Sequence, residues 1–150
     1  FNTQMQPPTL LIVVAILCLA VSGDNVFRIG SIYPESGGLK QDSIDSRDGQ
    51  ELWLEEVNRR GGFLINNETY KVEIIFKPIE PTANASTAAA LELVNDYDVD
   101  FFILPLSIDY GLPAAIVGHD HKINSIEPAT GVPSLLICDE NIEYPCESSF

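Results

Sequence analysis

The sequence predicts an α/β fold, a doubly wound parallel sheet, on three observations. Segments of strand length alternate along the chain with segments of helical period. The strand-like segments are rich in β-branched and aromatic residues, and one is apolar throughout, as in strands buried on both faces of a parallel sheet. The order is strand, helix, strand, helix, strand, possible helix, strand, and right-handed crossovers make such strands parallel. At 150 residues the chain has room for one domain at most.

The first strand and the loop after it form the beginning of this unit. Phe27–Tyr33 is β-branched and aromatic with small residues between, which predicts a buried strand. Pro34 is expected to end it, because proline lacks the N–H that a ladder needs. Ser36, Gly37 and Gly38 then predict a turn whose backbone can approach a ligand closely.

A helix is expected next, with either Asp45 or Ser46 as its N-cap. Gly61 is the predicted left-handed C-terminal cap. Leu52, Trp53 and Val57 supply the expected apolar face. The pairs Glu55–Arg59 and Glu56–Arg60 have the favourable i,i+4 order, with the acid first.

The second strand–helix unit follows a polar connection over 63–69, with a turn at Asn66-Asn67. Residues 70–77 alternate between apolar and polar, which predicts a strand that ends at Pro78. Thr82 is the predicted cap of a helix over 82–96 that is rich in alanine. Its stripe of Ala85, Ala89 and Leu93 permits close packing on a sheet.

The third unit is less regular. The all-apolar run 101–104 predicts a central parallel strand, and the turn Pro105-Leu106-Ser107 follows it. A helix over 112–117 is possible, but residues 118–121 break its periodicity. Residues 131–137 predict a turn and the fourth strand.

This organisation suggests where a ligand would bind. In the strand order 2-1-3-4, the first and third strands are neighbours, and ligands bind at the carboxyl ends of strands at such a switch point. The loops over 34–46 and 105–111 would then be adjacent. Their serine hydroxyls, free backbone N–H groups and a helix N-terminus can hold a carboxylate without a lysine or an arginine.

The opening block resembles the type I periplasmic-binding-protein family, which includes branched-chain amino-acid-binding proteins (leucine-binding domains) and the ligand-binding regions of cell-surface receptors. The resemblance extends from about Val26 to about Ser107, and it depends on the order and spacing of the matching residues together and not on any single one of them. The matching residues are Arg28-Ile29-Gly30, Pro34, Ser36-Gly37-Gly38, Arg47-Asp48-Gly49 and Trp53 through Gly62. Pro105-Leu106-Ser107 resembles the family's Gly-Pro-x-Ser turn, except that Leu104 stands where glycine is expected.

The resemblance implies a partial N-terminal lobe of a non-catalytic domain that binds a small polar ligand, such as an amino acid. It implies ligand contacts at Ser107 and at Ser36, Gly37 and Gly38. The fourth-strand contact would lie near Cys138 and Asp139, or alternatively at Ala129 and Thr130 in the turn over 125–130. The expected partner is a transporter or a linked transmembrane signalling domain, which reads the closure of two lobes on the ligand. The isolated chain is expected not to bind amino acids measurably.

The N-terminus predicts export. Thr9–Gly23 is an uncharged apolar run of signal-peptide length, and Val21 and Gly23 suit a cleavage site after Gly23, although no basic residue precedes the run. We therefore expect a signal peptide over 1–23 and a partial ligand-binding lobe over 24–150, secreted, on the outer side of a membrane, or in the periplasm of a bacterium. A retained signal anchor is the alternative.

Export also changes the interpretation of the cysteines and asparagines. Cys138 and Cys146 remain as a pair that could form a disulfide or stay as free thiols. Asn67 and Asn84 begin glycosylation triplets that would be used in a eukaryotic host.

Charge and motifs exclude several other classes. A net charge of −14 argues against binding to nucleic acid, whose phosphates would be repelled. His119 and His121 could begin a metal site in a secreted α/β enzyme, but no third ligand follows at a recognisable spacing. No nucleophile elbow, P-loop or dinucleotide fingerprint is present, so neither catalysis nor a cofactor is expected. An extracellular interaction module is the remaining alternative.

Overall fold

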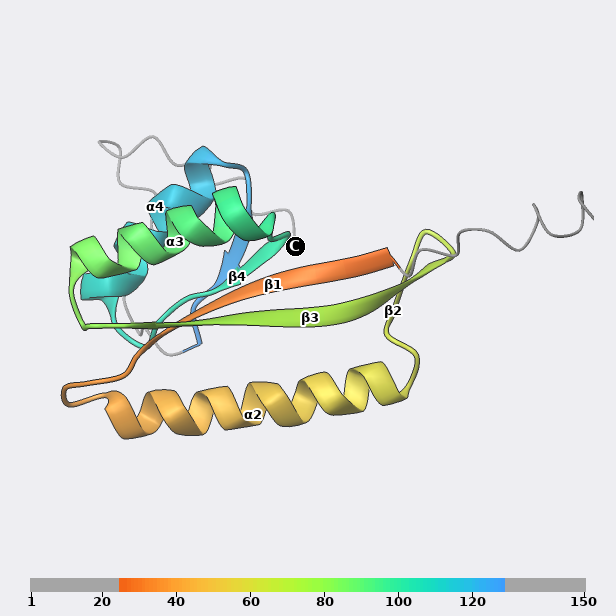
Figure 1. The fold of residues 1–150 in the computed structure, drawn as a ribbon, viewed down its shortest axis with the longest axis horizontal. Helices are drawn as coiled ribbons and strands as arrows, with labels where there is room; N and C mark the ends of the chain where they lie inside the picture. The colour runs from red at the N-terminus through yellow and green to blue at the C-terminus, as the bar shows by residue number, and fades with distance from the viewer. Residues whose placement is uncertain (1–24, 129–150) are drawn as a thin grey trace, which may run out of the picture.

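A computed structural model describes residues 25–128 of the chain. Its sheet has the strand order β2-β3-β1-β4-β5, and every pair is parallel except the β2–β3 hairpin (Figure 1). Without the hairpin strand this is the order 2-1-3-4 that was assumed for the site, and the doubly wound α/β prediction is confirmed. The elements are β1 (Asn25–Pro34), α2 (Lys40–Arg59), β2 (Phe63–Ile65), β3 (Glu68–Ile79), α3 (Ala83–Tyr97), β4 (Phe101–Ile103), α4 (Ile108–Asp120) and β5 (Asn124–Ile126).

Helices lie on both faces of the sheet, with α2 on one face and α3 and α4 on the other (Figure 1). Alternation along the strands separates two apolar clusters. On the α2 face, Ile29, Val72 and Ile74 are buried, with Leu54 and Val57 of the helix packed against them. On the other face, Phe102 and Leu93 are fully buried at the centre of the larger cluster.

The fourth parallel strand differs from its predicted position. β5 at Asn124–Ile126 pairs with β4, whereas the strand was expected over 131–137, which lies outside the described residues. All three residues of β5 are exposed and two are polar, so no apolar run marks the strand in the sequence. Backbone pairing to β4 defines it, together with the bond from Leu104 N–H to Ile126 O at 2.9 Å.

Helix α2 begins earlier than predicted. It starts at Lys40, neither Asp45 nor Ser46 caps it, and Leu39 at the N-cap makes no side-chain hydrogen bond. A glycine turn leads into it, because Gly37 adopts φ +79° and its carbonyl accepts from Lys40 N–H at 3.3 Å. The predicted C-terminus is confirmed, since Gly61 has φ +109° directly after the C-cap Arg60.

The predicted apolar face of α2 is partly wrong. Val57 packs against the sheet as expected, but Leu52 is 69% exposed and Trp53 is 41% exposed. Both predicted arginines form ion pairs, yet both pair with Glu56, at 2.6 Å each. The expected partner of Arg59, Glu55, is therefore replaced by the acid one residue later.

The second strand unit contains a hairpin that was missed. Phe63–Ile65 forms β2, antiparallel to β3, around the predicted turn, where Asn66 and Asn67 both have positive φ. The strand β3 also continues past Pro78 to Ile79, contrary to prediction. Proline is tolerated because β2 pairs only with the first residues of β3, so Pro78 lies at a free edge and is exposed.

Of the two helices on the other face, α3 begins as predicted and α4 is longer than predicted. The Thr82 cap of α3 is confirmed, as its side chain accepts from Ala85 N–H at 3.2 Å. Helix α4 was underpredicted, because it begins after Ser107 and runs through Gly118 to Asp120. Gly118 is buried inside the helix, and a Cβ there would lie 3.1 Å from the Phe102 ring, so glycine permits close packing on β4. No helix of the described residues is both long enough and apolar enough to cross a membrane.

Candidate functional site

The carboxyl edge of the sheet carries the predicted site. β1 and β4 are adjacent and parallel, with Ile29 opposite Phe101 and Ser31 opposite Ile103. The loops that follow them, over 35–39 and 104–107, therefore leave the same edge, which is on the left in Figure 1. The structure thus brings these two loops to the switch point of the sheet.

Within the first loop, Ser36 is already engaged. Its hydroxyl donates to Glu80 Oε2 at 2.6 Å, and Glu80 follows β3, on the side of β1 opposite to β4. Gly37 contacts Pro81, since a Cβ on it would lie 3.4 Å from the proline ring. Gly38 has open space around it, with no atom within 4 Å of the position that a Cβ would take. The glycine backbone is therefore the open part of this loop, and the serine hydroxyl is tied to the end of β3.

Within the second loop, Ser107 is the N-cap of α4. Its Oγ accepts from Asp109 N–H at 3.3 Å, and its own N–H donates to Pro105 O at 2.8 Å. The hydroxyl proton is not used by the capping bond, because Oγ acts there as an acceptor. Ser107 is partly buried, so this proton can point to a ligand at the edge.

Two helix N-termini meet this edge. Both α2 and α4 begin there, and the α2 terminus has no side-chain cap. The first N–H groups of a helix are without intrahelical partners and carry a partial positive charge, which favours an anion. Arg47, about two turns into α2, lies 5.8 Å from the centre of the Tyr33 ring, and its hydrogen bond to Tyr33 raises the pKa of the guanidinium.

Glu127 is a residue that sequence reasoning missed. It follows β5, and its Oε1 lies 2.8 Å from the position that a Cβ would take on Gly111 in the first turns of α4. A signal for it was present in the alternative turn over 125–130, because β5 ends at Ile126 and places that turn at the carboxyl edge. The residues named there as contacts, Ala129 and Thr130, lie outside the described residues, as do Cys138 and Asp139.

A small cavity joins the two loops behind the edge. It holds about 10 Å³ and lies between α2 and the turn over 104–106, with Ile32 and Tyr33 of β1 on its wall. Ser43 is 1% exposed and its Oγ has no hydrogen-bond partner among the described residues. This volume is close to that of one water molecule, which would satisfy the hydroxyl. None of the four predicted contacts (Ser36, Gly37, Gly38 and Ser107) lines it.

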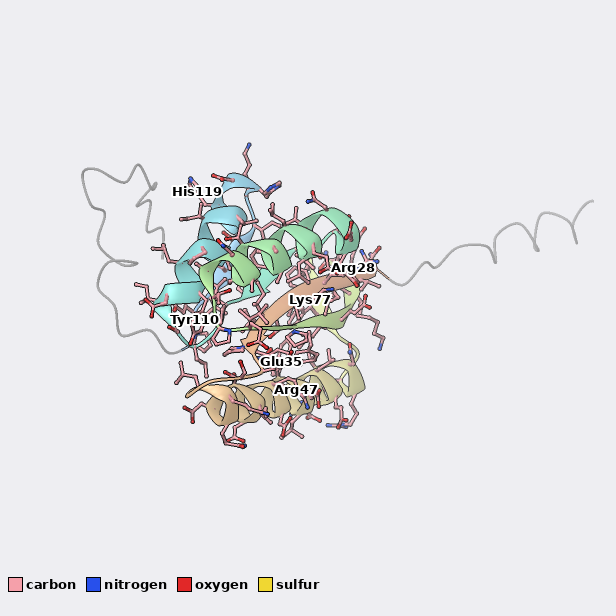
Figure 2. All side chains as sticks on the ribbon, turned by 60° about the vertical axis from the view of Figure 1, so that its left-hand side comes forward. Arg28, Glu35, Arg47, Lys77, Tyr110 and His119 are labelled. Carbon is pink, nitrogen blue, oxygen red and sulfur yellow. The ribbon has the colours of Figure 1, made fainter. Side chains whose placement is uncertain are left out.

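The histidines of the enzyme alternative lie elsewhere. His119 is exposed in the last turn of α4 and His121 is the residue after the helix, at the opposite end from Ser107. Figure 2 shows His119 far along the helix from Tyr110, which is near its start. Among residues 25–128 no group of three His, Cys, Asp or Glu side chains gathers that could hold a metal ion.

The two glycosylation triplets have different surroundings. Asn67, Glu68 and Thr69 are all exposed in the β2–β3 hairpin. Asn84 is exposed in the first turn of α3, but its Ser86 is fully buried and donates to Tyr110 O at 2.5 Å. The Asn84 triplet would therefore need modification before α3 and α4 pack together. The predicted signal peptide and the predicted Cys138–Cys146 disulfide lie outside the described residues.

Comparisons with known proteins agree with this architecture. The chain matches a family model described as "Periplasmic binding protein" over residues 26–147. Among solved structures, it is similar to the branched-chain amino acid transporter substrate-binding protein LivJ of Streptococcus pneumoniae in complex with isoleucine (TM-score 0.62, 21% identity, 70% of this chain and 29% of that one). It is also similar to the leucine-binding protein LivK of Thermotoga maritima (TM-score 0.60, 17% identity, 73% and 29%).

A third similar structure is a solute-binding protein of an ABC transporter from Rhodopseudomonas palustris in complex with 3,4-dihydroxybenzoic acid (TM-score 0.59, 21% identity, 69% of this chain and 27% of that one). No curated protein sequence matches the chain. The chain spans less than a third of the length of each of these structures, so it corresponds to a fragment of such a protein. These proteins are binding proteins and not enzymes. Because the family model covers most of the sequence, the chain belongs to the periplasmic binding protein family.

Proposed function

We propose that this chain is the N-terminal part of a domain that binds a small polar molecule, with the ligand's carboxylate held at the carboxyl edge of the sheet. The observation that supports this most directly is the junction of two loops and two helix N-termini between β1 and β4. Backbone N–H groups of Gly37 and Gly38 and the hydroxyl proton of Ser107 would donate to the carboxylate. Hydrogen bonds to a charged group contribute about 1.5–3 kcal/mol each. Ser36 would contribute only after release from Glu80.

The ligands named for similar structures support a carboxylate. Isoleucine, leucine and 3,4-dihydroxybenzoic acid differ in the rest of the molecule, but each carries one carboxylate. A lobe shared by binders of all three would most simply recognise their common group. We infer an amino acid or a similar carboxylate as the ligand of this chain.

The binding mechanism requires more polypeptide than this chain holds. Similar structures are more than three times as long as the part that matches, and two-lobed closure on a ligand is the motion that such a protein uses to signal occupancy. In this proposal the loops after β1 and β4 form one wall of the site and a second lobe forms the other. A transporter or a linked transmembrane domain would respond to closure.

We further propose that the chain acts outside the cytoplasm. Family membership implies a periplasmic or extracellular location. A signal peptide over 1–23 and a ligand-binding part over 24–150 fit this location, as do a Cys138–Cys146 disulfide and glycosylation. Of the two acceptors, Asn67 is the more accessible in the folded chain, because Ser86 of the Asn84 triplet is buried.

The test is an NMR titration of the ¹⁵N-labelled chain with L-leucine at high concentration. We expect weak shifts confined to the amides of Ser36–Gly38 and of the first turn of α4, because only one wall of the site is present. Replacing Ser107→Ala should abolish the shifts in α4. Thr87→Ala removes a hydroxyl that bonds to Ala83 O of its own helix and to neither loop of the proposed site, so it should leave them unchanged. Shifts that cluster at the other end of the sheet, or that survive Ser107→Ala, would refute the proposed site.

A further inference from the structure

Two buried side-chain oxygens of α2 have no hydrogen-bond partner among residues 25–128. Ser43 lies near the start of the helix and is 1% exposed, and its Oγ is one of them. The other is Oε1 of Gln50, which lies seven residues later, about two turns along the same side of the helix. A buried oxygen without a hydrogen bond costs free energy, so both atoms would gain from a partner.

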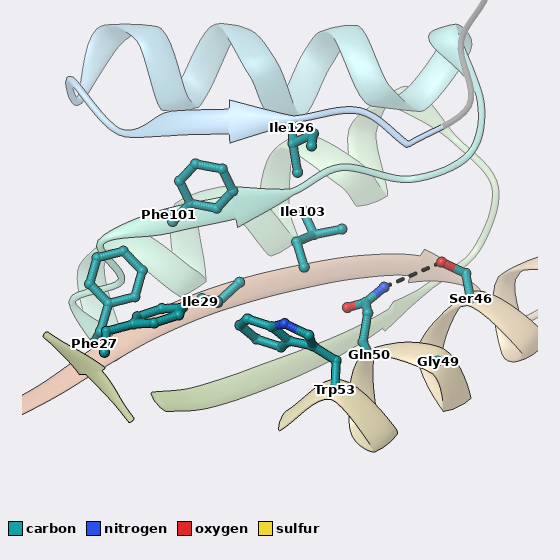
Figure 3. Close-up of a pocket in the computed structure, with 10 residues that line it drawn as sticks. Phe27, Ile29, Ser46, Gly49, Gln50, Trp53, Phe101, Ile103 and Ile126 are labelled. Atoms are coloured by element: carbon teal, nitrogen blue, oxygen red, sulfur yellow. Dashed lines mark hydrogen bonds between the residues drawn. The ribbon is translucent and has the colours of Figure 1, made fainter. Parts of the chain in front are cut away.

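One cavity lies against both residues. Its volume is about 10 Å³, and Ser43, Ser46 and Gln50 line it from α2, while the turn over 104–106 and the end of β1 line the rest. Ser46 Oγ accepts from Gln50 Nε2 at 3.3 Å, so the proton of the Ser46 hydroxyl is not used by that bond (Figure 3). Two hydroxyls and one amide oxygen therefore surround the cavity.

The chemistry of these groups selects the occupant. The amide oxygen of Gln50 can only accept a hydrogen bond, and the Ser43 hydroxyl can both donate and accept, so the occupant must supply at least one donor. No acidic side chain is among the described residues that line the cavity, which argues against a cation. The volume suits one water molecule and nothing larger, and buried waters usually make two to four hydrogen bonds.

Ser46 and Gln50 also line a second, larger space. This is an apolar groove of about 510 Å³ along the α2 face of the sheet, beside Trp53. Figure 3 shows the hydrogen bond between Ser46 and Gln50 at one end of the groove. The floor of the groove is formed by side chains of three strands, Ile29, Phe101, Ile103 and Ile126. The pair of polar side chains therefore lies between the small cavity and the open groove.

We propose that the small cavity is a binding site for one water molecule, which donates to Gln50 Oε1 and shares a second hydrogen bond with Ser43 Oγ. The water satisfies both buried oxygens and fills the space between α2 and the turn over 104–106. That turn leads into Ser107, the N-cap of α4, so the water helps to set how closely the turn packs on α2. The water site lies behind the carboxyl edge and does not depend on a ligand at that edge.

The first test counts long-lived internal water by ¹⁷O magnetic relaxation dispersion, in the full chain and in Ser43→Val. Valine removes the hydroxyl and brings a methyl group into the space of the water, so we expect the dispersion amplitude to fall by the amount of one water molecule. Serine hydroxyl protons do not contribute, because the oxygen nuclei of water are observed. An equal amplitude in wild type and in folded Ser43→Val would overturn the proposal.

The matched control is Ser125→Val. Ser125 is exposed in β5 and lines neither the cavity nor the groove, so the same substitution there should leave the dispersion amplitude unchanged. An equal loss in this control would show that the change does not come from the cavity, and it would also overturn the proposal.

A second measurement locates the water and needs only the wild type. The amide of Leu106, in the turn that lines the cavity, should show NOE and ROE cross-relaxation with water in the ratio of a long-lived water. The amide of Leu64, which is 71% exposed, should not. Absence of the Leu106 signal would overturn the proposal even if Ser43→Val does not fold. A signal that survives in folded Ser43→Val would assign it to the nearby Ser107 hydroxyl, with the same consequence.

Discussion

Gly62 is the residue whose backbone is most tightly constrained after α2. It has φ +96°, and a Cβ placed on it would lie 2.0 Å from the carbonyl oxygen of Tyr70. Its neighbour Gly61 has a similar φ of +109° but open space around it. The two glycines therefore separate the cost of backbone strain from the cost of a clash.

We predict that Gly61→Ala lowers the free energy of unfolding by about 1–3 kcal/mol, through strain alone. Gly62→Ala should cost at least about 2 kcal/mol more, because the backbone of β3 must move to accept the methyl group. Urea denaturation of the two variants measures the difference. Equal destabilisation would show that the contact with Tyr70 is not maintained.

Glu56 is a residue whose charge contributes to the end of α2. Hydrogen bonds from Arg59, and then from Arg60, hold the pKa of its carboxyl below the usual range, with a smaller opposing effect of burial. A lowered pKa means that the folded state favours the ionised form. The resulting stability is present above the pKa of the unfolded chain and is lost as the pH falls through the folded pKa.

Replacing Glu56→Gln should therefore reduce stability at neutral pH and have no effect at a pH below the folded pKa. The effect should be small and should shrink with added salt, since the side chains are largely exposed. Urea denaturation at a series of pH values measures it. Glu55→Gln is the control, because Glu55 forms no ion pair in the part of the chain that the structure describes. A gap between wild type and Glu56→Gln that persisted in acid would contradict the assignment.

At the scale of elements, Ser86 connects α3 to α4. Its side chain is fully buried and donates to Tyr110 O, so replacement by alanine removes the hydrogen bond between the two helices. We predict that Ser86→Ala lowers the free energy of unfolding by about 0.5–1.5 kcal/mol. Thr87→Ala is the matched control. Its hydroxyl bonds only to Ala83 O of the same helix, and alanine improves helix propensity, so stability should change little. Similar losses in both variants by thermal denaturation would argue against the interhelical bond.

Elements marked by their own residues were predicted well from the sequence. Thr82 capped α3 as expected, and the apolar run beginning at Phe101 became β4. Elements defined by pairing with distant residues were missed. β5 is a short polar segment held by β4, and the start of α2 depends on the Gly37 turn and not on a capping side chain. Gly118 looked like a helix breaker, but it packs against Phe102, which no local pattern shows.

At the scale of the whole molecule, the parallel α/β class could be predicted from the alternation of strands and helices, whereas the strand order 2-1-3-4 was an assumption that the sheet agrees with. With that order, β1 and β4 are neighbours, so the loops that follow them could be expected to lie side by side. The bond from Ser36 to Glu80, the position of Glu127 against Gly111 and the groove beside Trp53 all depend on side chains from separate elements. Contacts between side chains that lie far apart in the sequence cannot be predicted from local sequence patterns, so these were found only in the structure.

The most direct measurement on the whole molecule is titration calorimetry of this chain with L-leucine. In the proposed function the carboxyl edge supplies one wall of a site, and the chain matches less than a third of the length of the similar binding proteins. We predict no measurable heat of binding, because a few donors on one wall cannot offset the entropy lost by the ligand. Saturable binding with a micromolar dissociation constant would contradict the proposal that this chain holds half of a two-lobed site.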